Sequence, residues 1–142
     1  MVQSDSENTS VFQLRIYEVS SDKHDQFHER FEKHALRIMQ RYGFRPVVLW
    51  ESKSVSNFEF IYILEWPNAE TMERQWKAFL ADSEWIEIKR KMAGTIGEPV
   101  QRVTSRVLEG VKYSPAFHPF AIFHSSTDSG GGAEPVAGEG RS

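Results

Sequence analysis

Two stretches of the chain alternate apolar and polar residues and a third places aromatic residues at every second position, which is the period of a β-strand with one buried face. A fourth stretch contains the continuous apolar run Val47–Trp50. Aromatic and β-branched residues are concentrated in these stretches, as is typical of strands. The polar turn from Ser54 to Asn57 joins two of them into a hairpin. The predicted strands are Val11–Val19, Phe44–Glu51, Phe58–Trp66 and Val100–Leu108.

Two further stretches carry apolar residues at the spacing of an amphipathic helix. The first follows N-cap candidates at Ser20 to Asp22 and ends at Gly43, a residue type that commonly terminates helices. The second follows Pro67-Asn68, is interrupted near Asp82-Ser83 and ends within Gly94 to Pro99. Their apolar positions are Phe27, Phe31, His34 or Ala35, Ile38 and Tyr42 in the first helix, and Met72, Trp76, Phe79, Leu80, Trp85, Ile88 and Met92 in the second.

The order strand, helix, strand, strand, helix, strand is that of the ferredoxin-like βαββαβ arrangement. We therefore predict an α+β fold, a two-layer sandwich in which both helices cover one face of the sheet. Burial of large apolar side chains between the layers stabilises such a fold. The predicted core face of the sheet carries Phe12, Leu14, Ile16, Phe58, Phe60 and Leu64.

The opposite face of the predicted sheet is too mixed for a dry core and too apolar to be left in water. A symmetric homodimer that packs two such faces together would cover it. Ion pairs between adjacent strands, such as Arg15 with Glu59 or Glu65, would offset the cost of desolvating the charges. The residues expected on this face are Gln13, Arg15, Tyr17, Glu59, Ile61, Ile63, Glu65, Arg102 and Arg106.

The length of 142 residues fits one domain with tails. An aromatic segment from Tyr113 to His124 follows the last strand, and its apolar residues are costly to expose. It is expected to pack along a partner subunit or to close a pocket, where His118 or His124 would add polar chemistry. The predicted organisation is a flexible N-terminus at 1–10, the domain at 11–110, the aromatic C-terminal extension at 111–124 and a disordered tail at 125–142.

Charge and hydropathy exclude some classes of partner. The 17 Lys and Arg against 20 Asp and Glu give a formal net charge of -3, so no attraction to nucleic acid is expected. A mean hydropathy of -0.50 predicts no membrane span. The chain has no cysteine, which excludes disulfides and cysteine zinc sites and suits a reducing compartment, so we predict a cytoplasmic protein.

Several phrases of the sequence, in order and at similar spacing, resemble the NIPSNAP family. The resemblance covers Phe12 to about Leu108. It departs from the family at Gln13, where Glu is usual, and at Tyr62, where His is frequent. The matching phrases are QLRIY near the start, RYGF at Arg41–Phe44, the strand ending in Trp50, MERQWKAF in the second helix, ADSEW at Ala81–Trp85 and SRVL at Ser105–Leu108.

The resemblance implies a dimeric α+β barrel with a ligand pocket between the sheet and the helices of each subunit. Related barrels include cofactor-free monooxygenases of aromatic polyketides, haem-binding enzymes and small-molecule isomerases, and fold alone does not decide between them. We expect a homodimer that binds a small apolar or aromatic molecule and oxidises or isomerises it without a metal or organic cofactor. The alternative is a non-catalytic adaptor, in which the barrel is a scaffold and the aromatic extension recruits a protein.

His34 and Tyr62 are the candidate catalytic residues. His34 lies on the apolar stripe of the first helix and Tyr62 in the helix-facing register of its strand, so they are expected to meet in one compartment. There they would form an acid/base or oxyanion pair. The alternative for each is a hydrogen-bonded place in the core. Haem ligation by His34 is a further alternative that no other residue supports.

The candidate substrate-binding residues are aromatic or basic. Trp50, Trp66 and Trp76 are the expected walls of the pocket, with Trp85 as a fourth candidate, and core packing is the alternative for each. Arg15 and Tyr17 are expected to bind an anionic group in the barrel interior. The alternative for this pair is an ion pair in the dimer interface.

His24 and His28 are four residues apart on the first helix, which is the spacing of a metal-binding pair. Neither a third ligand nor a general base stands at motif distance from them. We therefore predict no metal site and interpret the two histidines as part of a solvated helix edge.

Overall fold

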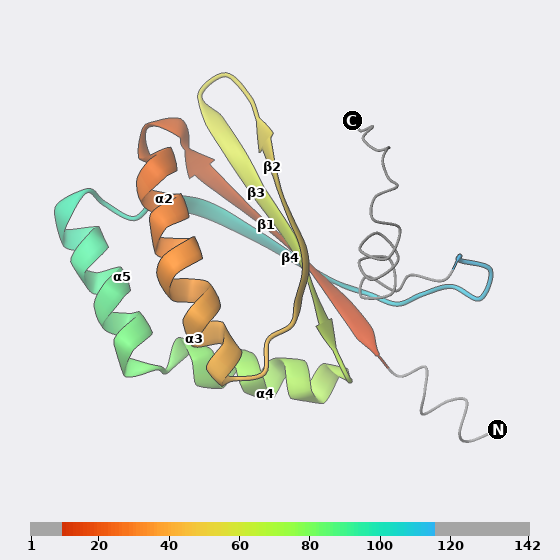
Figure 1. Cartoon of the computed structure of the whole chain (residues 1–142). Coiled ribbons are helices and arrows are strands. Elements are labelled where there is room, and N and C mark those ends of the chain that lie inside the picture. The colour runs from red at the N-terminus through yellow and green to blue at the C-terminus, as the bar shows by residue number, and fades with distance from the viewer. Residues whose placement is uncertain (1–9, 116–142) are drawn as a thin grey trace, which may run out of the picture. The chain divides into compact units, whose positions relative to one another are not determined.

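The structure is a computed structural model and describes residues 10–115. Its elements follow one another in the predicted order (Figure 1). The segment from η1 to α3 is one uninterrupted helical stretch with a π-helical turn in its middle. The elements are β1 (Val11–Ser20), η1 (Ser21–Lys23), α2 (His24–Arg30), η2 (Phe31–Ala35), α3 (Leu36–Arg41), β2 (Pro46–Lys53), β3 (Asn57–Trp66), α4 (Ala69–Leu80), α5 (Ser83–Thr95) and β4 (Val100–Leu108).

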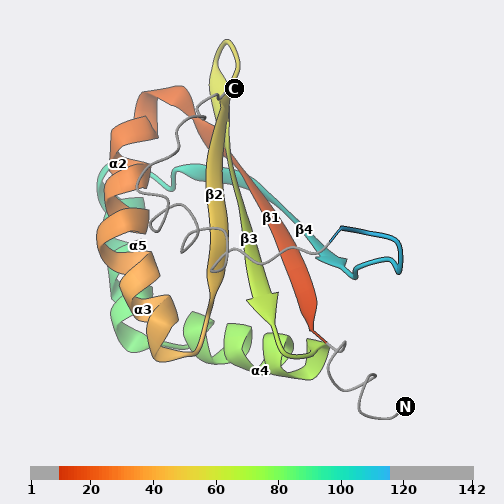
Figure 2. The ribbon, with the colours of Figure 1, turned by 45° about the vertical axis from the view of Figure 1, so that its right-hand side comes forward.

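The strands form one antiparallel sheet in the order β2-β3-β1-β4. The helices of residues 10–110 lie on one face of this sheet, so these residues form one helical layer and one sheet layer (Figures 1 and 2). This topology confirms the predicted α+β, ferredoxin-like βαββαβ fold. The second helical stretch is divided into α4 and α5, as the break near Asp82 indicated.

The first helical stretch ends at Gly43, as predicted. Gly43 has a φ of 78°, and its N–H donates to the carbonyl of Gln40 at 3.2 Å. The N–H of Phe44 donates to the carbonyl of Met39 at 3.2 Å, which completes a Schellman motif. At the other end, Ser20 makes no side-chain cap bond.

The core lies between the helices and one face of the sheet. On β3 the even-numbered residues are buried and the odd-numbered ones are half-buried, as the alternation predicted. The helices contribute residues from each predicted apolar stripe. The buried core includes Phe27, Phe31, Ala35, Ile38, Met39, Phe44, Phe58, Phe60, Tyr62, Leu64, Trp66, Met72, Phe79 and Trp85.

The prediction of which face of β1 meets the helices was wrong. Residues paired across neighbouring strands share a face, and Arg15 pairs with Tyr62 while Tyr17 pairs with Phe60. Gln13, Arg15 and Tyr17 therefore lie on the helix side. Their polar groups are tolerated there because hydrogen bonds and aromatic rings surround them. The residues that face away from the helices are Phe12, Leu14 and Ile16.

The face of the sheet away from the helices is therefore more apolar than predicted. Glu59 and Glu65 lie on this face, opposite to Arg15, so the predicted ion pairs with Arg15 are wrong. Instead, the Oε1 atom of Glu65 lies 3.8 Å from the Nη2 atom of Arg45. Apolar members of this face are Leu14, Ile16, Val48, Trp50, Ile61 and Ile63.

Residues 111–115 contain a turn in which the Ser114 N–H donates to the carbonyl of Val111 at 3.0 Å. Most of the predicted flexible N-terminus, the rest of the aromatic extension and the predicted disordered tail lie outside the described residues. None of the helices within residues 10–115 has the length and apolar character needed to cross a membrane.

Candidate functional site

A cavity of about 480 Å³ lies on the helix side of the sheet, in the layer where a pocket was expected. Small-molecule sites commonly have volumes of about 300–1,000 Å³. Arg15, Arg30, Lys89 and Glu98 bring charge to its wall. The rest of the wall is mostly apolar, and its aromatic members are Tyr17, Phe27, Phe31, Trp76, Phe79 and Trp85.

Arg15 places a largely buried cation at this cavity. Its guanidinium carbon lies 4.1 Å from the centroid of the Trp76 ring, and its Nη2 donates to the Tyr17 hydroxyl at 3.3 Å. Within residues 10–115 no carboxylate pairs with it, and its buried Nε has no hydrogen-bond acceptor. Burial lowers the pKa of Arg15, but the neighbouring oxygens of Tyr17 and Tyr62 raise it by a larger amount, so the net pKa is raised. The guanidinium is thus a permanent charge with an unused donor.

Tyr17 and Tyr62 form a hydrogen-bonded pair beside Arg15. Their hydroxyl oxygens are 2.6 Å apart. Tyr17 lines the cavity, whereas Tyr62 is fully buried behind it. Burial raises the pKa of Tyr62 well above its usual value, so this hydroxyl keeps its proton. The pair connects the cavity wall to a buried proton donor.

Gln13 organises two tryptophans next to the site. Its Oε1 accepts hydrogen bonds from the indole N–H of Trp66 at 2.9 Å and of Trp76 at 2.7 Å. Its Nε2 donates to the Ser105 hydroxyl at 3.0 Å, so the amide joins β1 to β3, α4 and β4. One buried side chain therefore fixes the tryptophan on which Arg15 rests.

The other arginine of the cavity has an acidic partner. Arg30 is 5% exposed and donates from Nη1 and Nη2 to the two oxygens of Glu98, at 3.0 and 2.9 Å. Burial alone raises the pKa of Glu98, but hydrogen bonds from Arg30 and from the Val100 N–H lower it, and the net pKa is lowered. This pair is satisfied within the fold, in contrast to Arg15.

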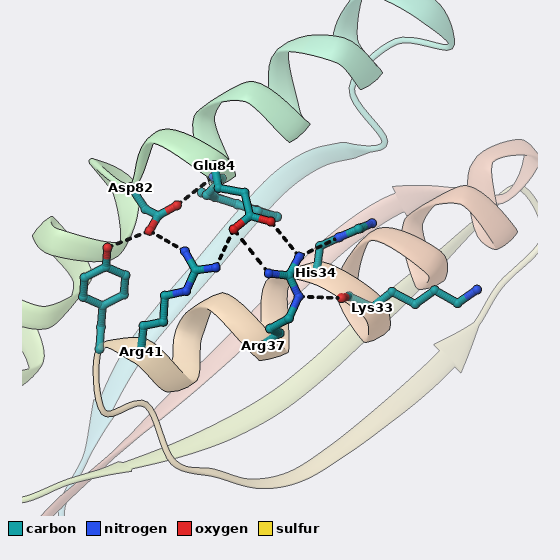
Figure 3. Close-up of polar contacts among 8 residues, drawn as sticks. Lys33, His34, Arg37, Arg41, Asp82 and Glu84 are labelled. Carbon is teal, nitrogen blue, oxygen red and sulfur yellow. Dashed lines mark hydrogen bonds and ion pairs between the residues drawn. The ribbon is translucent and has the colours of Figure 1, made fainter.

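His34 lies outside the cavity and does not meet Tyr62. Its Nδ1 accepts a hydrogen bond from Arg37 Nη2 at 2.9 Å, and its side chain lines a groove between the first helical stretch and α5 (Figure 3). Arg37 also donates to Glu84, which Arg41 contacts as well. Phe31 and Ala35, three residues before and one residue after His34, are buried and take the sheet-facing side of the helix, so His34 points away from the sheet.

The predicted tryptophan walls separate into three environments. Trp76 and Trp85 line the cavity. Trp66 is buried in the core against Phe44 and does not reach the cavity. Trp50 is 52% exposed and shares the face of Ile61, away from the helices, so its expected place in the wall was wrong.

Sequence reasoning missed the ion pair of Arg30 with Glu98 and the hydrogen bonds of the Gln13 amide to Trp66 and Trp76. Arg30 stands between Phe27 and Phe31 on the apolar stripe, and a charge within such a stripe indicates a buried partner. The partner itself lies 68 residues further along the chain, so no local spacing could identify it. Gln13 was assigned to the wrong face together with the rest of β1.

The fold matches proteins of known structure. The NIPSNAP profile matches residues 12–115. An uncharacterized NIPSNAP-like domain protein from Burkholderia xenovorans has a TM-score of 0.65 and 20% identity, covering 79% of this chain and 94% of its own. A NIPSNAP family protein of unknown function from Agrobacterium tumefaciens has a TM-score of 0.64 and 13% identity, covering 76% and 94%. No curated protein matches the sequence. Because the profile spans more than half of the chain, the chain belongs to the NIPSNAP family.

Proposed function

We propose that the protein binds a small aromatic or apolar molecule carrying an acidic or enolic oxygen in the cavity beside Arg15. The observation that carries this proposal is the contrast between the two arginines of the wall. Arg30 has a bidentate carboxylate, whereas Arg15 has an unused buried donor and no carboxylate partner among residues 10–115. An anionic oxygen of the ligand in the cavity would pair with the Arg15 guanidinium, and the aromatic wall would enclose the ring of the ligand.

The reaction that suits this arrangement is isomerisation by proton transfer. The Tyr17 oxygen accepts from Arg15 and lies 2.6 Å from the Tyr62 hydroxyl, and either hydroxyl can donate in this contact. When Tyr62 donates to Tyr17, the hydroxyl hydrogen of Tyr17 is free for the ligand. Arg15 would stabilise an enolate oxygen while Tyr17 exchanges a proton with the substrate.

We also propose that two chains form the barrel expected from the resemblance. The face of the sheet away from the helices carries Leu14, Ile61 and Ile63 along two neighbouring strands, and all three are half-buried in the single chain. Packing two such faces together would remove this apolar area from water. The cytoplasmic location suggested by the cysteine-free sequence is part of the same proposal.

Ligand binding is tested with 1-naphthoate and its neutral analogue 1-naphthamide by isothermal titration calorimetry. Arg15→Met should weaken naphthoate binding by about tenfold or more, because a charge-assisted hydrogen bond contributes about 1.5–3 kcal/mol. It should change naphthamide binding little. Arg90→Met, which removes an exposed charge from α5, is the matched control and should bind naphthoate like the wild type.

Proton transfer is tested separately with phenylpyruvate, which combines a ring, a carboxylate and an enolisable ketone. In the enol-to-keto step the enol oxygen loses a proton, and the carbon next to the new carbonyl group, which carries the ring, gains one. Tyr17→Phe should slow this step while leaving phenylpyruvate bound. The adaptor alternative predicts that neither naphthoate nor phenylpyruvate binds in any variant, and that result would remove the proposal.

A further inference from the structure

A second polar cluster lies between α2 and the edge strand β2, and none of its residues lines the cavity. It consists of His24 and His28 from the helix and Glu51 from the strand. The Glu51 Oε1 lies 2.9 Å from His24 Nε2 and 2.6 Å from His28 Nε2. The three candidate ligand atoms all lie within 4.8 Å of one another. Glu51 thus supplies in space the third ligand that the sequence around the histidines lacks.

We propose that His24, His28 and Glu51 form a zinc site, in which two imidazole nitrogens and one carboxylate oxygen bind the ion and water completes the shell. Two histidines and one carboxylate are a donor set that Zn²⁺ takes up when one position remains open. Histidine nitrogen favours zinc and its late first-row neighbours over Mg²⁺ or Ca²⁺, which prefer oxygen-only shells. The i,i+4 spacing places both rings on one side of the helix.

The hydrogen bonds around His24 already have the arrangement of a zinc ligand. Its Nδ1 lies 3.1 Å from a carboxylate oxygen of Asp25, while its Nε2 points at Glu51. In zinc proteins the ring nitrogen that does not bind the metal donates to a carboxylate in this way, which fixes the tautomer and the ring orientation. Asp25 is therefore assigned as a positioning residue of the site.

Both rings are also held by an aromatic neighbour. His28 is stacked on Phe58, with centroids 5.6 Å apart and an interplanar angle of 13°. The ring of His24 lies edge-on to the same phenyl group at 4.6 Å. The histidine side chains remain 34% exposed, which leaves a path for the ion and room for its water ligands. The site is thus ordered on one side and open on the other.

A zinc ion could also occupy the point where both histidines approach the same oxygen of Glu51. Two Nε2 atoms approach that oxygen, and each must carry a hydrogen to donate. A zinc ion replaces the Nε2 hydrogens and leaves both rings neutral. Donor atoms around tetrahedral zinc are about 3.4 Å apart, so small side-chain rotations close the site.

Zinc bound here would tie the edge strand to the helical layer. The ligands come from β2 and α2, which are 23 residues apart at their nearest ligand pair. An ion that binds the folded chain alone raises the free energy of unfolding in proportion to the logarithm of its free concentration. This consequence is independent of the ligand proposed for the cavity.

The test is zinc titration of the full-length protein, produced without a histidine tag and freed of metal with EDTA. We expect one zinc per chain with micromolar or tighter affinity, and a melting temperature that rises with zinc. His24→Gln/His28→Gln and Glu51→Gln should each weaken binding by more than about tenfold. Asp25→Asn should weaken it by about tenfold, while Asp22→Asn, which removes the same charge three residues away, should not.

The remaining histidines of the chain provide the matched control. The variant His34→Gln/His118→Gln/His124→Gln keeps only the two histidines of the cluster and should bind zinc like the wild type. This control does not depend on how well the Glu51 variant folds. Equal binding by the wild type and the His24/His28 variant would overturn the site, as would the absence of zinc binding by the wild type.

Discussion

The guanidinium of Arg15 rests on the indole of Trp76, with its central carbon 4.1 Å from the ring centroid. The contact joins β1 to α4 across the layer that contains the cavity. A cation over an aromatic face is stabilised by about 0.5–2 kcal/mol, and this contact leaves the buried Nε of Arg15 without an acceptor. The fold therefore positions the Arg15 charge with an aromatic ring, and in the proposed function a ligand would supply the anionic partner.

Arg15→Met should consequently leave the protein as stable as the wild type, or stabilise it by up to about 1 kcal/mol. The loss of the contact with Trp76 is offset because the unpaired buried Nε, which costs about 1–3 kcal/mol, is removed. Urea unfolding measures the change, with Arg90→Met as the surface control. A loss above about 2 kcal/mol would show that the contacts of Arg15 with Tyr17 and Trp76 outweigh the cost of its unpaired donor.

Gln13→Leu should destabilise the protein by about 2–4 kcal/mol, because it leaves the indole donors of Trp66 and Trp76 without their acceptor. Gln13→Glu keeps that acceptor and should cost less. The new carboxylate would share the helix side of β1 with Arg15, so Gln13→Glu should also weaken naphthoate binding. Urea unfolding and calorimetry measure the two effects, and equal stability of the Leu and Glu variants would contradict the role of Gln13 as an acceptor.

The elements of the fold could be predicted from the sequence because their signals are local. Alternation indicated most of the strands, the apolar run Val47–Trp50 indicated β2, and helical spacing indicated the helices. Gly43 marked a helix end that requires a positive φ. The face of β1 could not be predicted in the same way. A period of two divides a strand into two sets of residues, but both sets of β1 contain large side chains, and the aromatic environment that accepts Arg15 exists only after folding.

The contacts within the candidate sites were also only partly predictable, because they join residues far apart in the sequence. Tyr62, Tyr17 and Arg15 meet because neighbouring strands pair, which the strand order makes foreseeable. The neighbours of His34 and of Glu51 depend on how the first helical stretch is rotated about its own axis over the sheet. A small rotation moves a helix side chain from the core to a groove. The spacing of His24 and His28 was visible in the sequence, but the pair was interpreted as a solvated helix edge because its carboxylate neighbour Glu51 was not foreseen.

Stability should fall in acid through Glu84 at the start of α5. Hydrogen bonds from Arg37 and Arg41 lower the pKa of Glu84 to about 2 from an ordinary value of 4.5. A lowered pKa in the folded state adds stability above 4.5, and this contribution is lost as the pH falls toward 2. Glu84→Gln should therefore lower the urea midpoint at neutral pH and converge with the wild type near pH 2.

The control for this pH dependence is Glu73→Gln, the same substitution on the exposed surface of α4. Its difference from the wild type should stay constant over the same range of pH. A gap between Glu84→Gln and the wild type that persists unchanged into acid would mean that the contacts with Arg37 and Arg41 do not depend on the charge of Glu84.

The proposed dimer should dissociate when a charge is placed on the face of the sheet away from the helices. Ile61 pairs with Ile16 on one side and with Trp50 on the other, so it lies near the middle of this apolar face. Ile61→Glu would bury an unpaired carboxylate between the two sheets, at a cost of several kcal/mol, and should yield folded monomers in sedimentation equilibrium. Ile86→Glu, at a 49% exposed position on α5, should leave the dimer intact. If the wild type is already monomeric at micromolar concentration, or if both variants dissociate equally, the two sheets do not form the interface.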